Sequence, residues 1–290
     1  TENVTSSHPT SCSGIPLARS TRATDSAPSK RSVSVELVSL DIPQESGYLV
    51  PIGDLHRGDR HLSDRGLNKL KGYLDWVMGR PNAYVFLMGD ILNVASRTSK
   101  TNPFESDSDE YQKARDLFMP YRERIIGCIT GNHEQRMYKD YGFNPLQPFC
   151  NELGITYCGY SACIKVRVGK RPKRKNEFWQ TYWGFAHHGN GGGGTLGAAL
   201  NKKVKLQEIV HGMDWYMAGH DHQLICGTRN ILLPKKNRIE HQRVHYIDTG
   251  SFLDWNGSYA EEAAMAVSKQ GAPRLRFDGR DHHHDLHVSI

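Results

Sequence analysis

The sequence lacks an apolar run long enough to cross a membrane, and it lacks a Cys-x-x-Cys pair. A spanning helix needs roughly 18 consecutive apolar residues. We therefore expect no membrane partner and predict a cytoplasmic protein. Six cysteines occur in 290 residues without paired spacing, and we interpret them as free thiols in a reducing compartment.

A strong charge imbalance is also absent. The net charge is +6 and the pI about 8.9. This modest basic bias is compatible with an acidic partner such as nucleic acid, but it does not identify one. The length permits one large domain or two small ones, and it is sufficient to bury a substantial core.

The two ends of the chain differ in composition from the middle. Residues 1–32 are rich in Ser and Thr and poor in large apolar residues, which predicts a disordered tail. A transit peptide is the alternative, although a periodic apolar face is missing. Residues 279–290 carry His282, His283, His284 and His287, and they are expected to form an exposed His-rich tail. A single domain over 33–278 remains.

Within that domain, strand-like and helix-like segments alternate early, and strands cluster late. Apolar periodicity predicts helices over 61–80, 107–124, 144–153 and 196–211. It predicts strands over 33–37, 47–52, 83–88, 125–130, 157–168, 177–186 and 215–218, with two more in 224–248. This pattern favours an α/β fold with layered, mixed sheets.

Four predicted strands end in the same way, with a glycine followed by a residue able to bind metal. These exits are Gly53-Asp54, Gly89-Asp90, Gly131-Asn132 and Gly219-His220. Ligands in layered α/β folds gather beyond the carboxyl ends of strands. Glycine there permits a sharp turn or a close approach to an ion. One such exit means little, whereas four together indicate a metal site.

The spacing of further polar residues supports this interpretation. His56 follows Asp54 by two residues, and His222 follows His220 by two. Alternate side chains of an extended chain share a face, so each pair can reach one ion and Asp221 is expected to face the other way. The alternative for each pair is an ordinary hydrogen-bonded histidine near a strand end.

A fifth segment ends in two adjacent histidines, His187 and His188. Neighbouring residues on a strand point to opposite faces, so only one is expected to be a ligand, and we favour His188. The glycine-rich run from Gly189 to Gly194 follows it. This run is either a flexible loop or a lid over the site.

The ordered set of motifs resembles the calcineurin-like metallophosphoesterase superfamily. The matching segments are Gly53-Asp54-Leu55-His56, Gly89-Asp90, Gly131-Asn132-His133-Glu134, His188-Gly189 and Gly219-His220-Asp221-His222. The resemblance implies two packed mixed β-sheets flanked by helices, a four-layer sandwich. It also implies that the chain hydrolyses phosphate esters with two metal ions.

Carried over by position, the resemblance implies a role for each of these residues. Asp54, His56 and His222 would hold one ion, Asn132, His188 and His220 the other, and Asp90 would bridge them. His133 resembles the catalytic histidine that protonates the leaving oxygen. Glu134 either orients His133 or is a surface residue. Asn93 stands where many members have an acid.

The ligand set contains only nitrogen and oxygen donors. Such donors suit Mn²⁺, Fe, Zn²⁺ or Ni²⁺, and Mn²⁺ is our first choice. The leading hypothesis is a phosphodiesterase or nuclease acting on nucleic acid or nucleotides. Alternatives are a phosphomonoesterase, including a protein phosphatase, a non-catalytic metal-stabilised scaffold, and a nucleic-acid-binding module. The oligomeric state is left open.

Basic and aromatic residues bear on the substrate. The segment from Lys165 to Lys175 is dense in Lys and Arg, with a hairpin tip expected at Gly169–Pro172. It is either a solvated turn or a contact to a phosphate backbone. Trp179, Tyr182 and Trp183 could stack on bases or pack in a strand core. Arg57, Arg60 and Arg97 follow ligand-bearing strands, and Arg57 and Arg97 are the candidate phosphate-binding residues.

Overall fold

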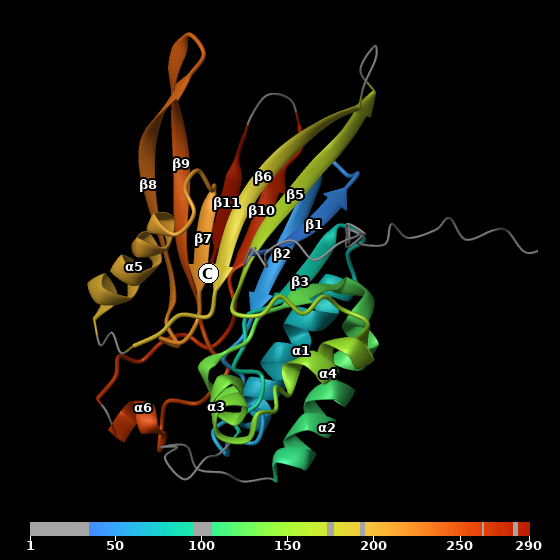
Figure 1. Cartoon of the computed structure of the whole chain (residues 1–290), viewed down its shortest axis with the longest axis vertical. Helices are drawn as coiled ribbons and strands as arrows, with labels where there is room; N and C mark the ends of the chain where they lie inside the picture. Colours follow the sequence, from blue (N-terminus) through green and yellow to red (C-terminus); the bar gives the residue numbers. More distant parts are fainter. Residues whose placement is uncertain (1–34, 95–105, 173–176, 192–194, 263, 281–283) are drawn as a thin grey trace, which may run out of the picture.

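The computed structural model describes residues 35–94, 106–172, 177–191, 195–262, 264–280 and 284–290. The predictions for residues 1–32 and for Arg97 lie outside these ranges. Two β-sheets pack face to face, with helices on the outer side of each (Figure 1). The predicted four-layer α/β architecture is therefore confirmed. No helix within the described ranges is long and apolar enough to span a bilayer.

The larger sheet has six strands in the order β1-β5-β6-β7-β9-β8. Its strands are β1 (Glu36–Ile42), β5 (Ser161–Pro172), β6 (Glu177–His187), β7 (Trp215–Ala218), β8 (Leu224–Lys235) and β9 (Arg238–Thr249). The pairs β1–β5, β6–β7 and β7–β9 are parallel, whereas β5–β6 and β8–β9 are antiparallel. The sheet is therefore mixed, as predicted.

The smaller sheet has five strands in the order β11-β10-β2-β3-β4. Its strands are β2 (Ser46–Ile52), β3 (Ala83–Leu87), β4 (Ile125–Cys128), β10 (Arg274–Asp278) and β11 (Leu286–Ser289). Strands β2, β3 and β4 are parallel, and β10 is antiparallel to both β2 and β11. The expectation of an exposed tail is wrong for 286–289, because β11 pairs with β10 and Leu286 is buried in the core.

The helices are α1 (Asp64–Met78), α2 (Asp107–Phe118), α3 (Asn132–Tyr141), α4 (Leu146–Leu153), α5 (Leu196–Lys205) and α6 (Tyr259–Glu262), with 3₁₀ turns at Met119–Arg124 and Leu206–Glu208. Helix α1 begins where Ser63 accepts a hydrogen bond from the Gly66 N–H, and it buries Leu70, Leu74 and Val77 on one face. Helix α3 was not predicted. Its sequence, NHEQRMYKDY, has Met137 as its one aliphatic residue, so its apolar signal is weak.

The alternation of side chains along β3 shows how the layers are held together. Val85 and Leu87 pack against the helices α1, α2 and α4. Tyr84 and Phe86 point the other way, into the core between the two sheets. A third core lies between the larger sheet and α5. Because β3 is buried on both faces, its sequence is a continuous apolar run.

Candidate metal centre

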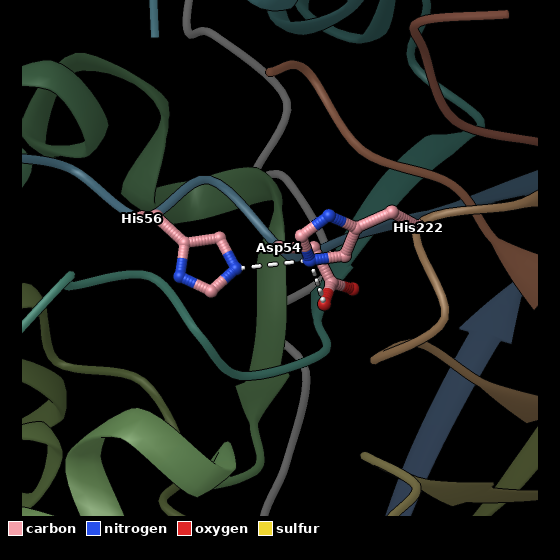
Figure 2. Close-up of side chains that lie close together, drawn as sticks. All are labelled: Asp54, His56 and His222. Atoms are coloured by element: carbon pink, nitrogen blue, oxygen red, sulfur yellow. Dashed lines mark hydrogen bonds and ion pairs between the residues drawn. The ribbon is translucent and has the colours of Figure 1, made fainter. Parts of the chain in front are cut away.

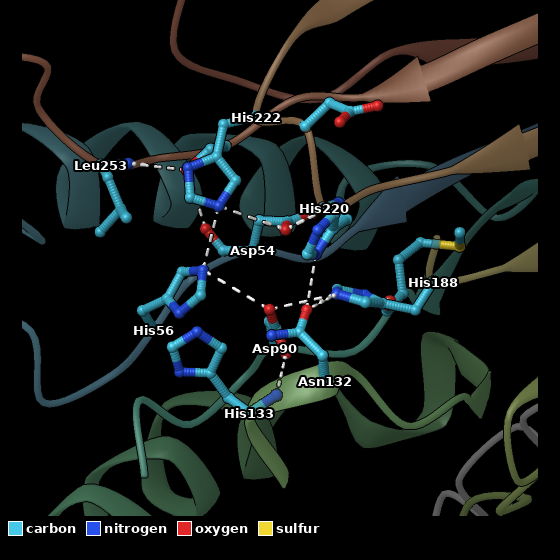
Figure 3. A network of polar contacts seen from close by, with 12 residues as sticks. Asp54, His56, Asp90, Asn132, His133, His188, His220, His222 and Leu253 are labelled. Atoms are coloured by element: carbon cyan, nitrogen blue, oxygen red, sulfur yellow. Dashed lines mark hydrogen bonds and ion pairs between the residues drawn. The ribbon is translucent and has the colours of Figure 1, made fainter. Parts of the chain in front are cut away.

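The seven residues predicted as metal ligands lie together (Figure 3). They follow the carboxyl ends of β2, β3 and β4 in the smaller sheet and of β6 and β7 in the larger one. In both sheets these strands are parallel to their ligand-bearing neighbours. Their exits therefore meet at one edge, where the two sheets come together.

One group of donor atoms belongs to Asp54, His56 and His222 (Figure 2). His222 Nε2 lies 3.4 Å from Asp54 Oδ1 and 3.1 Å from His56 Nε2. The buried Asp54 Oδ2 and His56 Nδ1 atoms have no hydrogen-bond partner in the described part of the chain. The donor atoms that converge, and that are placed to hold one cation, are Asp54 Oδ1 and the Nε2 atoms of His56 and His222.

A second group surrounds the Asn132 side chain. Its Oδ1 lies 3.0 Å from His188 Nε2 and 2.6 Å from His220 Nδ1. The opposite amide orientation would instead donate to these nitrogens and accept from Arg136. The orientation that places the oxygen among the ring nitrogens brings lone pairs together, which is favourable around a cation. The donor set thus fits a metal ion.

Asp90 lies between the two groups. Its Oδ2 is 3.1 Å from His188 Nε2 and 3.7 Å from His56 Nε2. Its Oδ1 accepts a hydrogen bond of 2.8 Å from the His133 backbone N–H. This carboxylate therefore occupies the position that a bridging ligand requires.

Backbone strain is concentrated at the same residues. Asp54, His56, Asp90, His220 and His222 have φ angles between 46° and 72°, in the left-handed region. Residues other than glycine adopt this region at a cost and do so mainly at functional sites. Within the described ranges, only Val94 and Ala264 share this property. The fold thus holds five of the seven candidate ligands in strained conformations.

The glycine before Asn132 is required by close packing. A Cβ atom on Gly131 would lie 2.1 Å from Asp90 Oδ1 and 2.2 Å from the Asp90 backbone N. No side chain fits in that space, so the loop after β4 can approach Asp90 only with glycine at this position. This agrees with the predicted role of glycine at the strand exits.

His188 rather than His187 lies in the cluster. His188 Nδ1 is 2.8 Å from the Met88 carbonyl, which can only accept, so Nδ1 carries the hydrogen and Nε2 faces Asp90 and Asn132. His187 Nδ1 instead accepts a hydrogen bond from the Gly189 N–H. Residues 192–194 of the glycine run lie outside the described ranges.

His133 lies beside the ligands but is held differently. Its Nδ1 is 2.5 Å from the Asn93 carbonyl, so this nitrogen also carries the hydrogen and Nε2 is left for proton exchange. Its ring packs edge-on against the ring of His56 at 4.3 Å. Burial lowers the pKa of His133, although the charge of Asp90 opposes this shift. Asn93 contributes its backbone carbonyl here, and its side chain has no partner among the described residues.

Glu134 is a buried structural carboxylate and not a surface residue. Its two oxygens accept hydrogen bonds from the backbone N–H groups of Asp90, Ile91, Leu92 and Gly131, at 2.7–3.1 Å. Burial, reinforced by the charge of Asp90, raises the pKa of Glu134 to about 7. It therefore ties the loops after β3 and β4 together, and none of its hydrogen bonds goes to the His133 side chain.

The electrostatics of the metal-free cluster show how strongly it attracts positive charge. Burial opposes a charge on His188, yet Asp90 raises the pKa of His188 to about 10. Burial would raise the pKa of Asp90, but His188 and His133 hold it well below its ordinary value. Burial, with the charge of His133, lowers the pKa of His56 well below its usual value. The carboxylate of Asp90 thus favours positive charge at this point of the cluster.

The cluster opens into a cavity of about 490 Å³. Five of the candidate ligands and His133 line the cavity together with Arg136 from α3, residues from 251–270, and Asp59, His61, Asp221 and Gln223. Arg57 is half-buried and pairs with Leu92 through its backbone, and Arg60 is exposed. Arg136, one turn after His133 on α3, was missed because α3 itself was not predicted.

The basic stretch from Lys165 lies along β5, away from the cluster. Its tip was expected at Gly169–Pro172, but these residues belong to the strand, and 173–176 lie outside the described ranges. Arg171 pairs with Phe178, ten residues before His188, a separation of roughly 30 Å along an extended strand. No groove along the metal centre is therefore formed by this end of the stretch.

The aromatic residues proposed to stack on bases are engaged within the fold. Tyr182 is fully buried between the sheets. Lys165 Nζ lies over the Trp183 ring at 5.3 Å, and the Arg167 guanidinium lies over Trp179 at 5.0 Å. Arg167 also pairs with Asp41. These contacts favour the interpretation of this segment as an ordinary charged strand surface.

Comparison with known proteins agrees with the site. The family model described as calcineurin-like phosphoesterase matches residues 49–224, which contain every candidate metal ligand. A search of curated proteins found no match.

Several solved structures are similar to the chain. Calcineurin-like phosphoesterase YfkN from Bacillus subtilis is 11% identical, with a TM-score of 0.35, and the match covers 86% of this chain and 91% of that one. GAP50, the anchor in the inner membrane complex of Plasmodium, is 7% identical, with a TM-score of 0.44 and coverage of 84% and 88%. Pseudomonas putida nuclease MPE is 13% identical, with a TM-score of 0.32 and coverage of 78% and 83%.

Proposed function

Because the chain belongs to the calcineurin-like phosphoesterase family, we propose that it is a two-metal enzyme that hydrolyses phosphate esters. The observation that carries this proposal is the convergence of two donor groups on either side of Asp90. A scaffold without catalysis would not need a buried histidine at the ligands with one nitrogen free for proton exchange, as His133 has.

Each donor group would hold one ion. Asp54, His56 and His222 form the first site, and Asn132, His188 and His220 form the second. Asp90 bridges them. Two divalent ions would supply concentrated positive charge for the phosphate and would acidify a bound water. Mn²⁺ is the proposed metal, with Fe, Zn²⁺ or Ni²⁺ as alternatives, because the donors are nitrogen and oxygen.

His133 would act on the leaving group. Its Nδ1–H is held by the Asn93 carbonyl, which leaves Nε2 to carry a proton toward the ester oxygen that departs. Arg136 lines the same cavity and would bind a phosphate oxygen through its guanidinium. Arg57 has weaker support as a phosphate-binding residue, because it is not among the residues that line the cavity.

Among substrates, the geometry favours nucleotide-sized esters over long nucleic acid. The nucleic-acid hypothesis depended on the basic stretch near Lys165, whose described residues run along β5 away from the metal centre. A phosphomonoesterase, including a protein phosphatase, is the second candidate. A cavity with residues 251–270 as one wall is compatible with a small monoester.

Metal analysis combined with ester hydrolysis tests the proposal. With Mn²⁺, the protein should bind two ions per chain and hydrolyse p-nitrophenyl phosphate or its bis ester. His133→Ala should keep both ions and lose about 10²–10⁴-fold in kcat, whereas Asp90→Asn should lose metal as well. His241→Ala, at an exposed position on β9, is the matched control. Full activity in His133→Ala would contradict the mechanism, and fewer than two ions with no turnover would favour the scaffold.

A further inference from the structure

One wall of the metal-centre cavity is formed by residues that follow the family match. The match ends at residue 224, whereas the wall is drawn from 251–270, between the end of β9 and the start of β10. In Figure 1 this segment, which contains α6, lies at the same end of the molecule as α3. The wall is therefore a feature of this chain beyond the part that the family model describes.

The wall is fastened to the loop that carries Asp54 and His56. The Asp254 N–H donates to the His61 carbonyl at 2.9 Å. The His61 ring bonds through Nε2 to the Gly257 carbonyl at 2.9 Å, while its Nδ1 lies 2.7 Å from Asp59 Oδ1. Ser251 Oγ donates to the Asp54 carbonyl at 2.9 Å. Hydrogen bonds thus connect the wall to the loop of the first metal site.

It is also fastened to the loop that carries His220 and His222. Gln223 Nε2 donates to the Ala266 carbonyl at 3.3 Å, and the Leu224 N–H donates to Ser268 Oγ at 2.9 Å. Beneath it, Phe252 is fully buried against Tyr73 of α1. With attachments on both sides and an anchor below, the wall is a formed part of the pocket.

The surface that the wall presents to the cavity is partly apolar. Leu253 lies beside His222 at the edge of the metal centre (Figure 3). Trp255 Nε1 donates to the Met265 carbonyl at 2.9 Å, so the only polar atom of the indole is already satisfied. The half-buried side chains of Leu253, Trp255 and Met265 therefore offer flat, apolar contact next to the ligands.

The size of the cavity limits what can reach this contact. At about 490 Å³, it falls within the range of pockets for small molecules, about 300–1,000 Å³. A double helix cannot enter a pocket of that size. A phosphate group at the metal centre would place its organic substituent near the wall.

On these observations we propose that the wall selects small phosphate esters, of nucleotide size, whose organic group packs a flat apolar face on Leu253, Trp255 and Met265. The proposal rests on the phosphoesterase function proposed above. It assigns specificity to Trp255 and Leu253 and leaves the metal ions and His133 to act on the phosphate itself.

Two phosphonates that differ only in their organic group test this assignment by binding. Calorimetry with Mn²⁺-loaded protein should show phenylphosphonate binding about tenfold tighter than methylphosphonate. Trp255→Ala and Leu253→Ala should bring that ratio toward one, whereas Trp255→Phe, which keeps a flat ring, should preserve most of it. Trp179→Ala, at the other end of β6, should leave the ratio unchanged.

The outcomes separate the two proposals. Methylphosphonate binding by the unaltered protein with a ratio near one would overturn the wall assignment and leave the metal centre intact. A tenfold ratio that survives both Trp255→Ala and Leu253→Ala would also overturn it. Failure of both probes to bind would overturn the phosphoesterase proposal together with the assignment. Nicking of closed circular duplex DNA as fast as small esters are hydrolysed would show that the wall does not exclude polymers.

Discussion

Lys203 Nζ lies 2.7 Å from Oδ2 of Asp221, the residue that separates His220 from His222. The lysine is on α5 and is only 1% exposed. It also contacts Asp248 Oδ2 at 2.5 Å, and the neighbouring Lys202 reaches the other Asp221 oxygen at 2.6 Å. Asp221 points away from the metal ligands as expected, although the left-handed φ angles of His220 and His222 show that this segment is not the extended chain that was assumed. Two lysines of α5 thereby fix the loop that carries both histidines.

Replacing Lys203 should therefore weaken both the fold and the metal centre. Lys203→Met leaves two carboxylates short of a buried partner, which typically costs about 3–5 kcal/mol. We expect lower unfolding free energy in urea and fewer than two Mn²⁺ ions per chain. Adding Asp248→Asn should recover part of the stability, because it removes one uncompensated charge. Lys205→Met, at an exposed position on the same helix, is the control. An equal loss of unfolding free energy and of bound Mn²⁺ in this control would contradict the role assigned to Lys203.

A second prediction concerns the carboxylate of Glu134. A glutamine at this position offers one oxygen where Glu134 offers two, and its amide nitrogen would face backbone N–H donors. Leaving such groups unpaired costs about 1–3 kcal/mol each. Glu134→Gln leaves two such groups unpaired, so it should lower the unfolding free energy by about 2–6 kcal/mol and weaken metal binding. Glu123→Gln, at an exposed site, should do neither. An unaffected Glu134→Gln would show that its hydrogen bonds are dispensable.

Stability below neutral pH should depend on His245 of β9, which is 5% exposed. Burial lowers the pKa of His245 to about 4, below the ordinary value of about 6.5. Between these values the unfolded chain binds a proton that the folded chain does not, so stability is lost as pH falls from 6.5 toward 4. One such group contributes up to about 1.4 kcal/mol per pH unit.

The His245 effect is isolated by comparing two proteins. Urea unfolding between pH 4 and 7 should show a shallower decline for His245→Gln than for the unaltered chain. His241 is exposed and precedes His245 on the same strand. The unfolding free energy of His241→Gln should therefore decline with pH as it does in the unaltered chain. If the unfolding free energy of all three proteins declined in parallel as pH falls, His245 would not account for the loss of stability.

The positions of the candidate ligands could be predicted from the sequence because Asp54, Asp90, Asn132 and His220 each follow an apolar strand and a glycine. Such strands are recognisable without tertiary information, and parallel neighbours bring their exits together. Alternation predicted that only one of His187 and His188 faces the cluster, and His188 was favoured because the glycine run follows it; the structure places His188 in the cluster.

Other parts of the site depend on contacts that no local pattern encodes. Arg136 lies on α3, whose sequence carries only a weak apolar signal. The wall around Trp255 is defined by hydrogen bonds to residues such as His61, nearly 200 positions earlier. Residues 286–289 were assigned to a tail because histidines and aspartates dominate the sequence just before them, whereas pairing with β10 and burial of Leu286 decide the structure of β11.

Close packing at Gly219 gives the most selective test of the geometry. A Cβ atom there would lie 2.2 Å from Asp54 Oδ2, joining the loop after β7 to the loop after β2. The φ angle of Gly219 is not among the positive ones, so Gly219→Ala adds overlap without backbone strain. It should push Asp54 and His220 apart, cost about 1–3 kcal/mol of stability, and reduce bound Mn²⁺ below two ions per chain. Gly197→Ala on α5, where a Cβ meets nothing within 4 Å, should instead be neutral or stabilise by up to about 1 kcal/mol. Full metal content in Gly219→Ala would mean that Asp54 can move without loss of its ion, contrary to the proposed assignment.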